Sequence, residues 1–282
     1  MNKDLSSQVE LMFAELNRQS VASSFPEPGT LSGVLSAHVV DSSPTTIVPA
    51  KPKELTHFAT AAVEMWLRSV HSFLISVSLT DASPIWSSVA GYYSSHYSIR
   101  AFAHVFGVFH LHRKKRIVYL DKQGTRLVFR IEKKRAEDRE HKFYWKYVSE
   151  HPQLIADPFF YSFRDDVSNS DGAHRNNANY SDHIDRFPVF LPLDAEFLRK
   201  RVERISNVVF SDVPVPRADS FPDTVNVQFV AYHRLVKFRR LLDEALGSKN
   251  RFWKVHRNPS WCPSTMNFSV VDPVFAALYA GR

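Results

Sequence analysis

Apolar residues recur every three or four positions along much of the chain, which is the period of an amphipathic helix. This spacing predicts a helix over about 7–19, opened by the capping-box pattern Ser7–Glu10, and a longer helix over 54–79. A second long helix is expected over about 84–111. Because only a short turn separates the two long helices, they predict an antiparallel helical hairpin. Three further helices are expected over residues 136–149, 194–207 and 223–246.

The helical period ends after about residue 112. Residues 116–120 and 125–131 are two short runs rich in β-branched and aromatic residues, and a turn sequence, Asp121–Gly124, lies between them. A β-hairpin is therefore expected as an insertion within 112–135. The predicted fold class is mainly α, a helical bundle over 54–250 that carries this hairpin.

Three parts of the chain lack a clear period. They are residues 22–53, 152–192 and 251–282. The first carries five prolines among Ser and Thr, and it predicts an extended arm with one or two short strands around Leu35–Val40. Together with the first helix it forms an N-terminal segment, 1–53, that docks on a partner or across the main body. A short helix near 173–182 is expected within the second part, and the third is a C-terminal tail.

The net charge of +7 is concentrated in one stretch. Residues 111–146 hold 13 Lys and Arg against 5 Asp and Glu, and the rest of the chain is close to neutral. Such a patch indicates either a polyanionic partner, here RNA, or a solvated hairpin face. The candidate nucleic-acid-binding residues are Arg113, Lys114, Lys115, Arg116, Arg126 and Arg130. The aromatic residues interleaved with them, which either stack on bases or are buried, are Tyr119, Phe129, Tyr144 and Trp145.

Composition and motifs exclude several other classes. The single cysteine, Cys262, excludes an internal disulfide and a cysteine-based zinc site, and it favours a reducing compartment, most simply the cytoplasm. The most apolar run, 85–111, contains five Ser, three His and Arg100, which favours a buried protein helix over a membrane span. No phosphate-binding loop, dinucleotide-binding turn, zinc-protease motif or serine-hydrolase motif occurs, so no cofactor and no metal is expected.

A polar stripe follows the second long helix. Tyr92, His96, Arg100 and His104 recur every four residues, which places them on one helix face. Arg and His together could face an RNA phosphate, where Arg stabilises developing charge and His transfers a proton. The alternative is a structural arginine that holds the bundle together.

Two short segments resemble a known family. Gly91-Tyr-Tyr-Ser-Ser-His-Tyr-Ser-Ile-Arg-Ala101 resembles the second-helix motif of HEPN-superfamily proteins, an aromatic pair and small residues followed by Arg-Ala. Arg175-Asn-Asn-Ala-Asn-Tyr180 resembles the Arg-x-x-Ala-Asp-Tyr element of the same group. The resemblance covers about 54–210 and implies a four- or five-helix bundle that is usually a homodimer. Many members are metal-independent endoribonucleases of toxin–antitoxin, CRISPR and antiviral defence systems, and others are non-catalytic binding or scaffold subunits.

The resemblance also implies a candidate catalytic site. It consists of Arg175, Asn176 and His183, with Arg100 and His104 nearby across the bundle. In this reading Arg175 stabilises the pentacovalent phosphate, and a histidine moves a proton at the 2′-hydroxyl or the leaving oxygen. Nuclease members place four to six residues between Arg and His, whereas seven separate Arg175 from His183 here. The alternative for this segment is a capped turn whose polar side chains satisfy backbone groups.

Overall fold

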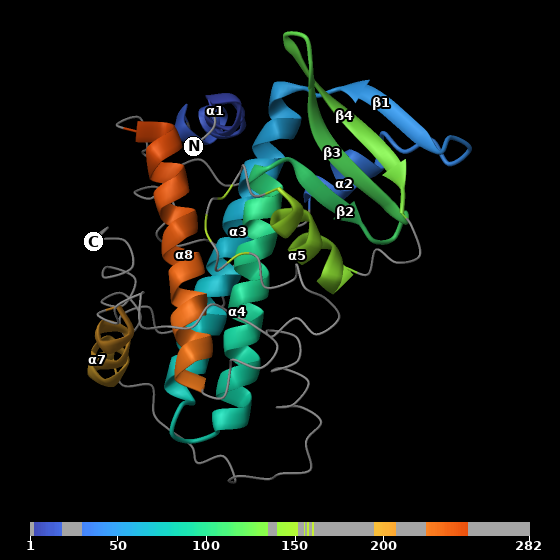
Figure 1. Ribbon diagram of the computed structural model, residues 1–282. Coiled ribbons are helices and arrows are strands. Elements are labelled where there is room, and N and C mark those ends of the chain that lie inside the picture. The colour runs from blue at the N-terminus through green and yellow to red at the C-terminus, as the bar shows by residue number, and fades with distance from the viewer. Residues whose placement is uncertain are drawn as a thin grey trace. The chain divides into compact units, whose positions relative to one another are not determined.

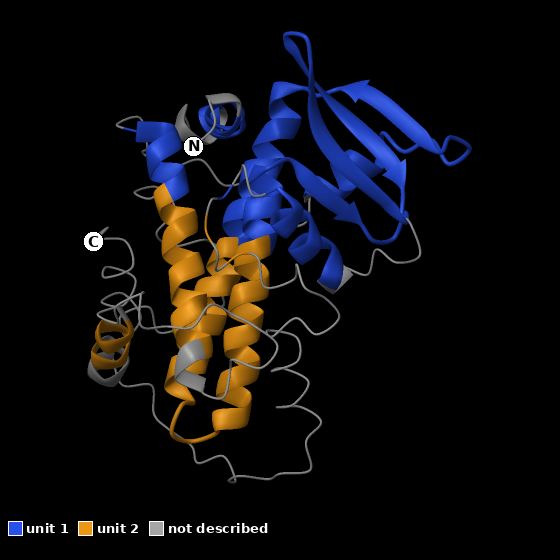
Figure 2. Cartoon of the chain, in the orientation of Figure 1, with its two compact units in different colours: residues 1–65, 100–155, 241–262 blue, residues 66–99, 156–240, 263–282 orange. Residues whose placement is uncertain are grey.

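The structure is a computed structural model that describes the chain in several stretches (Figure 1). They are residues 3–18, 30–134, 140–151, 155, 157, 160, 195–206 and 224–247. The chain divides into two compact units, each built from separate parts of the sequence (Figure 2). Unit 1 comprises residues 1–65, 100–155 and 241–262. Unit 2 comprises residues 66–99, 156–240 and 263–282.

Most of the described residues are helical, and a small antiparallel sheet accompanies the helices. The helices are α1 (Lys3–Arg18), α2 (Thr30–Ser36), α3 (Pro52–Ser78), α4 (Pro84–Val105), α5 (Glu140–Glu150), α7 (Ala195–Ser206) and α8 (Thr224–Leu246). The strands are β1 (Thr45–Pro49), β2 (Val108–Leu111), β3 (Arg116–Gln123) and β4 (Arg126–Lys133). The expectation of a mainly α protein with a β-hairpin is confirmed at this level.

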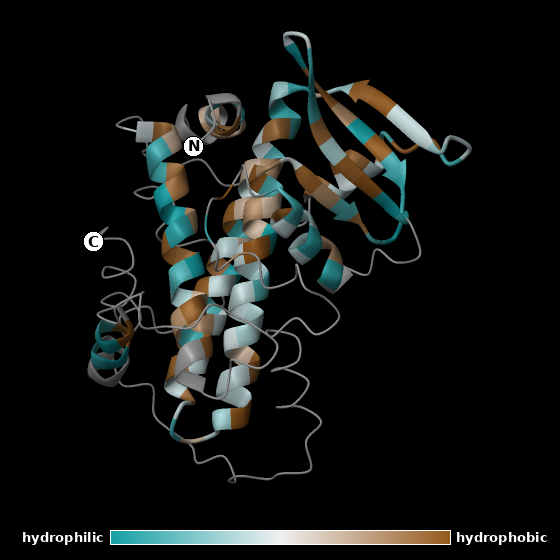
Figure 3. Cartoon of the chain, viewed as in Figure 1, coloured by the Kyte–Doolittle hydropathy of each residue, from teal (hydrophilic) through white to brown (hydrophobic). Residues whose placement is uncertain are grey.

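The sheet has the strand order β1-β4-β3-β2, with every neighbouring pair antiparallel. The predicted hairpin is β3 and β4, which are joined by a two-residue loop after the Gln123–Arg126 pair. Gly124 in that loop has a φ of 60°, a backbone conformation that favours glycine. The strands contain both hydrophobic and hydrophilic residues (Figure 3), and the register pairs Val118 with Ile131 and Leu120 with Phe129 on one face and Tyr119 with Arg130 on the other.

The second long helix is shorter than predicted. It ends at Val105 instead of near Leu111, and residues 108–111 form strand β2. Gly107 makes the change of direction possible, because it has a φ of 81° and its carbonyl accepts a hydrogen bond from the Leu120 amide at 2.7 Å. A Cβ at Gly107 would lie 2.5 Å from the Cβ of Leu120. Pairing with β3 thus overrides the helical period of this segment.

The N-terminal arm also differs from the prediction. Residues 30–36 form helix α2, and the short strand expected around Leu35–Val40 lies instead at 45–49, where β1 pairs with β4. Arg116 helps to fix this segment, because its Nη2 donates to the carbonyls of Asp41 and Ser43, each at 3.2 Å. The partner of β1 is more than 75 residues away in sequence, so no local pattern could have predicted the strand.

One face of the sheet packs on helices within unit 1. Phe129 of β4 and Phe109 of β2 both contact the ring of Phe58 on α3, with ring centroids 5.8 Å and 6.4 Å apart. Helix α1 belongs to the same unit, where Gln8 donates to the carbonyl of Val105 at 3.1 Å. One apolar face of α1 is buried, namely Leu5, Val9, Met12 and Phe13, whereas Leu11 is exposed. The first helix therefore docks within unit 1.

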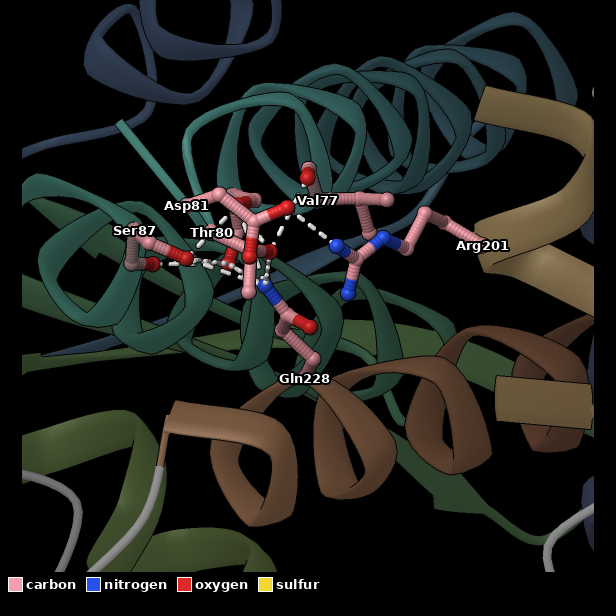
Figure 4. A network of polar contacts seen from close by, with 7 residues as sticks. Val77, Thr80, Asp81, Ser87, Arg201 and Gln228 are labelled. Atoms are coloured by element: carbon pink, nitrogen blue, oxygen red, sulfur yellow. Dashed lines mark hydrogen bonds and ion pairs between the residues drawn. The ribbon is translucent and has the colours of Figure 1, made fainter. Parts of the chain in front are cut away.

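The predicted helical hairpin is α3 and α4, joined by residues 79–83, and its part from 66 to 99 belongs to unit 2. Ser69 of α3 donates to the carbonyl of Ser94, and Ser76 exchanges hydrogen bonds with Ser87. Helix α8 adds Gln228, whose amide nitrogen is the centre of the polar network in Figure 4. These small and polar side chains allow a close approach of the helices and satisfy one another in the buried interior.

No helix among the described residues combines the length and the hydropathy that a membrane span requires.

Candidate functional site

The second face of the sheet carries the candidate site of unit 1. Because side chains alternate along a strand, Ile117, Tyr119 and Asp121 of β3 share this face with Arg130 and Glu132 of β4. Helix α5 packs against the same face, where the hydroxyl of Tyr144 accepts a hydrogen bond from the amide of His110 at 3.0 Å (Figure 1).

A cavity of about 410 Å³ lies between this sheet face and α5. Its lining residues are Ile117, Tyr119, Asp121, Arg130, Glu132, Lys133, Phe143, Lys146, Tyr147, Glu150 and His151. The volume falls in the range typical of small-ligand sites, about 300–1,000 Å³. Most of these side chains are polar, so the cavity suits a polar occupant.

Arg130 holds a fixed position in this cavity. Its Nε donates to Asp121 at 2.5 Å and its Nη1 donates to Glu132. The guanidinium carbon lies 4.3 Å from the centroid of the Tyr119 ring, which places the cation over the aromatic face. Two carboxylates therefore bind the edge of the guanidinium, and the Tyr119 ring covers one of its faces.

Tyr147 and His151 form the α5 side of the cavity. Their rings stack with centroids 4.2 Å apart, and Tyr147 also lies 6.2 Å from the ring of Tyr119. Burial raises the pKa of the Tyr147 phenol, and the nearby Tyr119 and Asp121 add to that shift. The phenol is therefore protonated at neutral pH and can donate a hydrogen bond.

Exposed cations gather at both ends of strand β3. Arg113, Lys114 and Lys115 form the turn that precedes the strand, and they are all exposed. Lys133 is at the same end, because its neighbour Lys134 donates its amide to the carbonyl of Lys115. The exposed cations at the other end of the strand are Lys122 and Arg126. The cavity lies along β3, between these two basic ends.

The six predicted nucleic-acid-binding residues fall into two groups. Four are exposed, namely Arg113, Lys114, Lys115 and Arg126. The other two, Arg116 and Arg130, are engaged inside unit 1: Arg116 is 7% exposed and bonds backbone carbonyls, and Arg130 bonds two carboxylates. The first group lies at the surface, where Lys114 Nζ is 4.0 Å from a carboxylate oxygen of Asp41, whereas the second group organises the sheet.

The four aromatic residues expected either to stack on bases or to be buried also fall into two groups. Phe129, Tyr144 and Trp145 are fully buried, so in this conformation they belong to the core, and Tyr119 alone of the four lines the cavity. Sequence reasoning missed Tyr147 and His151. Their spacing of four residues, with Tyr147 on α5 and His151 directly after its last residue, is the signal that could have identified them as neighbours.

Arg100 and His104 lie together on α4, in unit 1. The Arg100 guanidinium lies 5.2 Å from the ring centroid of Tyr144, and the His104 ring meets the same tyrosine edge to face at 5.7 Å. His104 is 1% exposed, and its Nδ1 donates to the carbonyl of Val108 at 3.0 Å. Burial and, to a smaller extent, the charge of Arg100 lower the pKa of His104 to about 3, and the bond to Val108 opposes this shift. The imidazole is thus neutral and out of reach of an RNA phosphate in this conformation.

The other three predicted catalytic residues, Arg175, Asn176 and His183, lie outside the residues that the structure describes, as does the expected helix near 173–182. Their role therefore stays a prediction. The remaining members of the polar stripe, Tyr92 and His96, are buried in unit 2, where their rings stack with centroids 6.1 Å apart.

Unit 2 contains a polar cluster that sequence reasoning missed. His233 of α8 pairs with the buried carboxylate of Asp157 at 2.7 Å, and Lys237 lies 3.7 Å from the same oxygen. The adjacent Arg234 is fully buried over the ring of Phe160. A sequence separation of 76 residues between His233 and Asp157 leaves no local signal for the pair.

In the stretches that the structure describes, no three His, Cys, Asp or Glu side chains are grouped as metal ligands. Comparison of the chain with models of protein families, with curated proteins and with solved structures finds no match.

Proposed function

We propose that this protein is RNA-directed and that it binds RNA through the sheet of unit 1. The observation that carries the proposal is the pair of exposed basic ends of strand β3, with Arg113, Lys114 and Lys115 at one end and Arg126 at the other. Exposed Lys and Arg near a polyanion release condensed counterions, which is the main source of non-specific affinity for nucleic acids. Aromatic and polar side chains between the two ends favour a single strand over a duplex.

The wider setting of the proposal comes from the HEPN resemblance of Gly91–Ala101 and Arg175–Tyr180. It favours a HEPN-like protein of a prokaryotic defence or toxin–antitoxin system. RNA cleavage, where it occurs, is assigned to Arg175, Asn176 and His183. A non-catalytic scaffold subunit is the alternative, and it would retain its protein partner without salt-dependent RNA affinity.

The salt dependence of RNA affinity tests the binding surface. Arg113, Lys114 and Lys115 are changed together to Gln, and the dissociation constant for a short unstructured oligouridylate is measured over a range of salt concentrations. The logarithm of the association constant falls linearly with the logarithm of the salt concentration, and for a single strand each phosphate contact adds about 0.7 to the steepness of this line. The triple variant loses three contacts, so its line should be less steep by about 2.

The matched control changes three exposed cations of unit 2, Lys200, Arg204 and Arg240, to Gln. It alters the net charge by the same amount, and we expect the slope of the wild-type protein. An equal loss of slope in both variants would contradict the proposed surface, because the effect would then come from net charge alone.

Cleavage is tested separately on labelled RNA in the presence of a chelator. If the chain is a metal-independent ribonuclease, changing Arg175 and His183 together to Ala should abolish cleavage and leave the salt-dependent affinity unchanged. Cleavage that survives this double substitution, and also survives Arg100→Ala, would remove the catalytic part of the proposal.

A further inference from the structure

We propose that the cavity between the sheet and α5 is a subsite for one unstacked nucleobase, which stacks on the guanidinium of Arg130. This inference rests on the proposed RNA-binding function and assigns a specific contact to that interface.

The first step is the state of Arg130. Its Nε and Nη1 are bonded to Asp121 and Glu132, and one side of its plane lies over Tyr119. Its side chain nevertheless stays 31% exposed, and it lines the cavity. A guanidinium plane that is held in place and borders a cavity can serve as a stacking platform for a base. Because two carboxylates already neutralise its charge, it is a poor phosphate contact.

The second step is the charge of the cavity wall. Three acids, Asp121, Glu132 and Glu150, face three bases, Arg130, Lys133 and Lys146, so the fixed charges balance. A balanced polar wall favours a neutral planar group with both donors and acceptors over an anion or an apolar chain. A nucleobase has these properties, and the Tyr147 hydroxyl is a protonated donor available to its edge.

The third step is the position of the cavity along β3. Ile117, Tyr119 and Asp121 follow one another on the same sheet face, from the Arg113–Lys115 turn toward Arg126. A strand whose phosphates contact both basic ends would therefore pass over the cavity opening. The backbone contacts then supply affinity that is independent of sequence, and the cavity receives a base.

The experiment separates base from backbone. Affinities are measured for an oligouridylate and for an oligomer of the same length that carries sugars and phosphates without bases. Wild-type protein should bind the oligouridylate about ten-fold more tightly, which corresponds to one stacked base. Arg130→Lys keeps the positive charge but removes the planar guanidinium. This variant should therefore bind the two oligomers with about equal affinity. Arg204→Lys is the same change at an exposed position of α7 in unit 2, outside the proposed RNA surface, and should keep the ten-fold preference.

The outcomes distinguish this inference from the proposed function. Salt-dependent binding of both oligomers with equal affinity would overturn the base subsite and leave the RNA surface intact. No salt-dependent binding of either oligomer would overturn the proposed function itself. Free uridine monophosphate that binds as tightly as the oligomer would overturn the strand assignment and indicate a mononucleotide site.

A second measurement uses the unaltered protein, so it does not depend on the folding of a variant. An oligomer that contains thiouridine is irradiated in the complex, and the crosslinked peptide is identified by mass spectrometry. We expect the crosslink at Tyr119, Tyr147 or His151, which line the cavity. Crosslinks confined to residues outside the cavity would overturn the inference.

Discussion

The arginines of strands β3 and β4 have different structural roles, which depend on the groups that surround each guanidinium. Arg116 donates to two backbone carbonyls near β1, and Arg130 is bound by two carboxylates over an aromatic ring. Arg126, at the end of the same hairpin, is exposed. A guanidinium presents five donors in a rigid plane, so its neighbours decide whether it supports a loop, forms a stacking surface or meets a phosphate.

His104 shows the effect of burial on a single titratable group, and it leads to a pH prediction. Its pKa is lowered in the folded state to about 3, so between pH 3 and 6.5 the unfolded chain binds a proton that the folded chain does not. Stability is therefore lost as the pH falls below 6.5, at up to about 1.4 kcal/mol per pH unit from this residue. His104→Asn keeps a donor for the Val108 carbonyl and removes the titration. Urea unfolding between pH 7 and 4 should show a shallower loss of stability for this variant.

The control for this prediction is His112→Asn, because His112 is exposed and its substitution should keep the wild-type slope. A remaining slope is expected in His104→Asn, since burial also lowers the pKa values of His57 and His71. If the free energy of unfolding depends on pH in the same way in both Asn variants and in the wild-type protein, the prediction that His104 is buried and neutral is wrong.

At the scale of elements, a turn sets the position of the basic end of the sheet. Lys115 has a φ of 49°, which is uncommon for a residue other than glycine, and its amide donates to the carbonyl of His112 at 3.2 Å. The Lys115 carbonyl accepts from the amide of Lys134 at 2.9 Å. These bonds hold the turn at the end of β3 and β4, so the cations that it carries project from an ordered backbone.

Helix packing in unit 2 depends on a glycine, which gives a second prediction. A Cβ at Gly91 of α4 would lie 2.8 Å from Cγ1 of Val227 on α8 and 3.1 Å from Oγ of Ser76 on α3. Gly91→Ala should therefore lower the free energy of unfolding by about 1–2 kcal/mol, because the overpacking exceeds the gain in helix propensity. Chemical denaturation measures the change.

Gly33→Ala is the matched substitution on helix α2, where an added Cβ meets nothing within 4 Å. Helix propensity alone should raise the free energy of unfolding there by about 0.5–1 kcal/mol. Equal stabilisation by the two substitutions would show that α4 and α8 do not approach as closely as the structure places them.

At the scale of the whole molecule, charge and polar packing are separated between the two units. The stretch 111–146 carries the positive excess of the chain, and its described part belongs to one sheet and one helix of unit 1. In unit 2 the polar side chains of α3, α4 and α8 bond one another, as the Gln228 network of Figure 4 shows. The proposed interface therefore lies in unit 1, and the Gln228 network of unit 2 serves helix packing.

Sequence reasoning located most elements of the described fold. The long helices, the β3–β4 hairpin and the exposed cations of the turns were all predictable, because helical period, alternation and turn residues are local properties of the chain. The basic stretch was predictable for the same reason. Lys114 is an example, since a lysine beside a turn sequence is exposed in nearly any fold that contains the turn.

The features that define the candidate site depended on contacts between distant residues. Strand β1 exists because β4 offers it an edge, and α4 ends at Val105 because Gly107 meets Leu120. Arg130 differs from Arg126 because Asp121, Glu132 and Tyr119 surround it. Tertiary structure alone decided which strand arginines are engaged inside unit 1, which rings are buried and where the cavity lies, since these outcomes depend on which side chains meet after the chain folds.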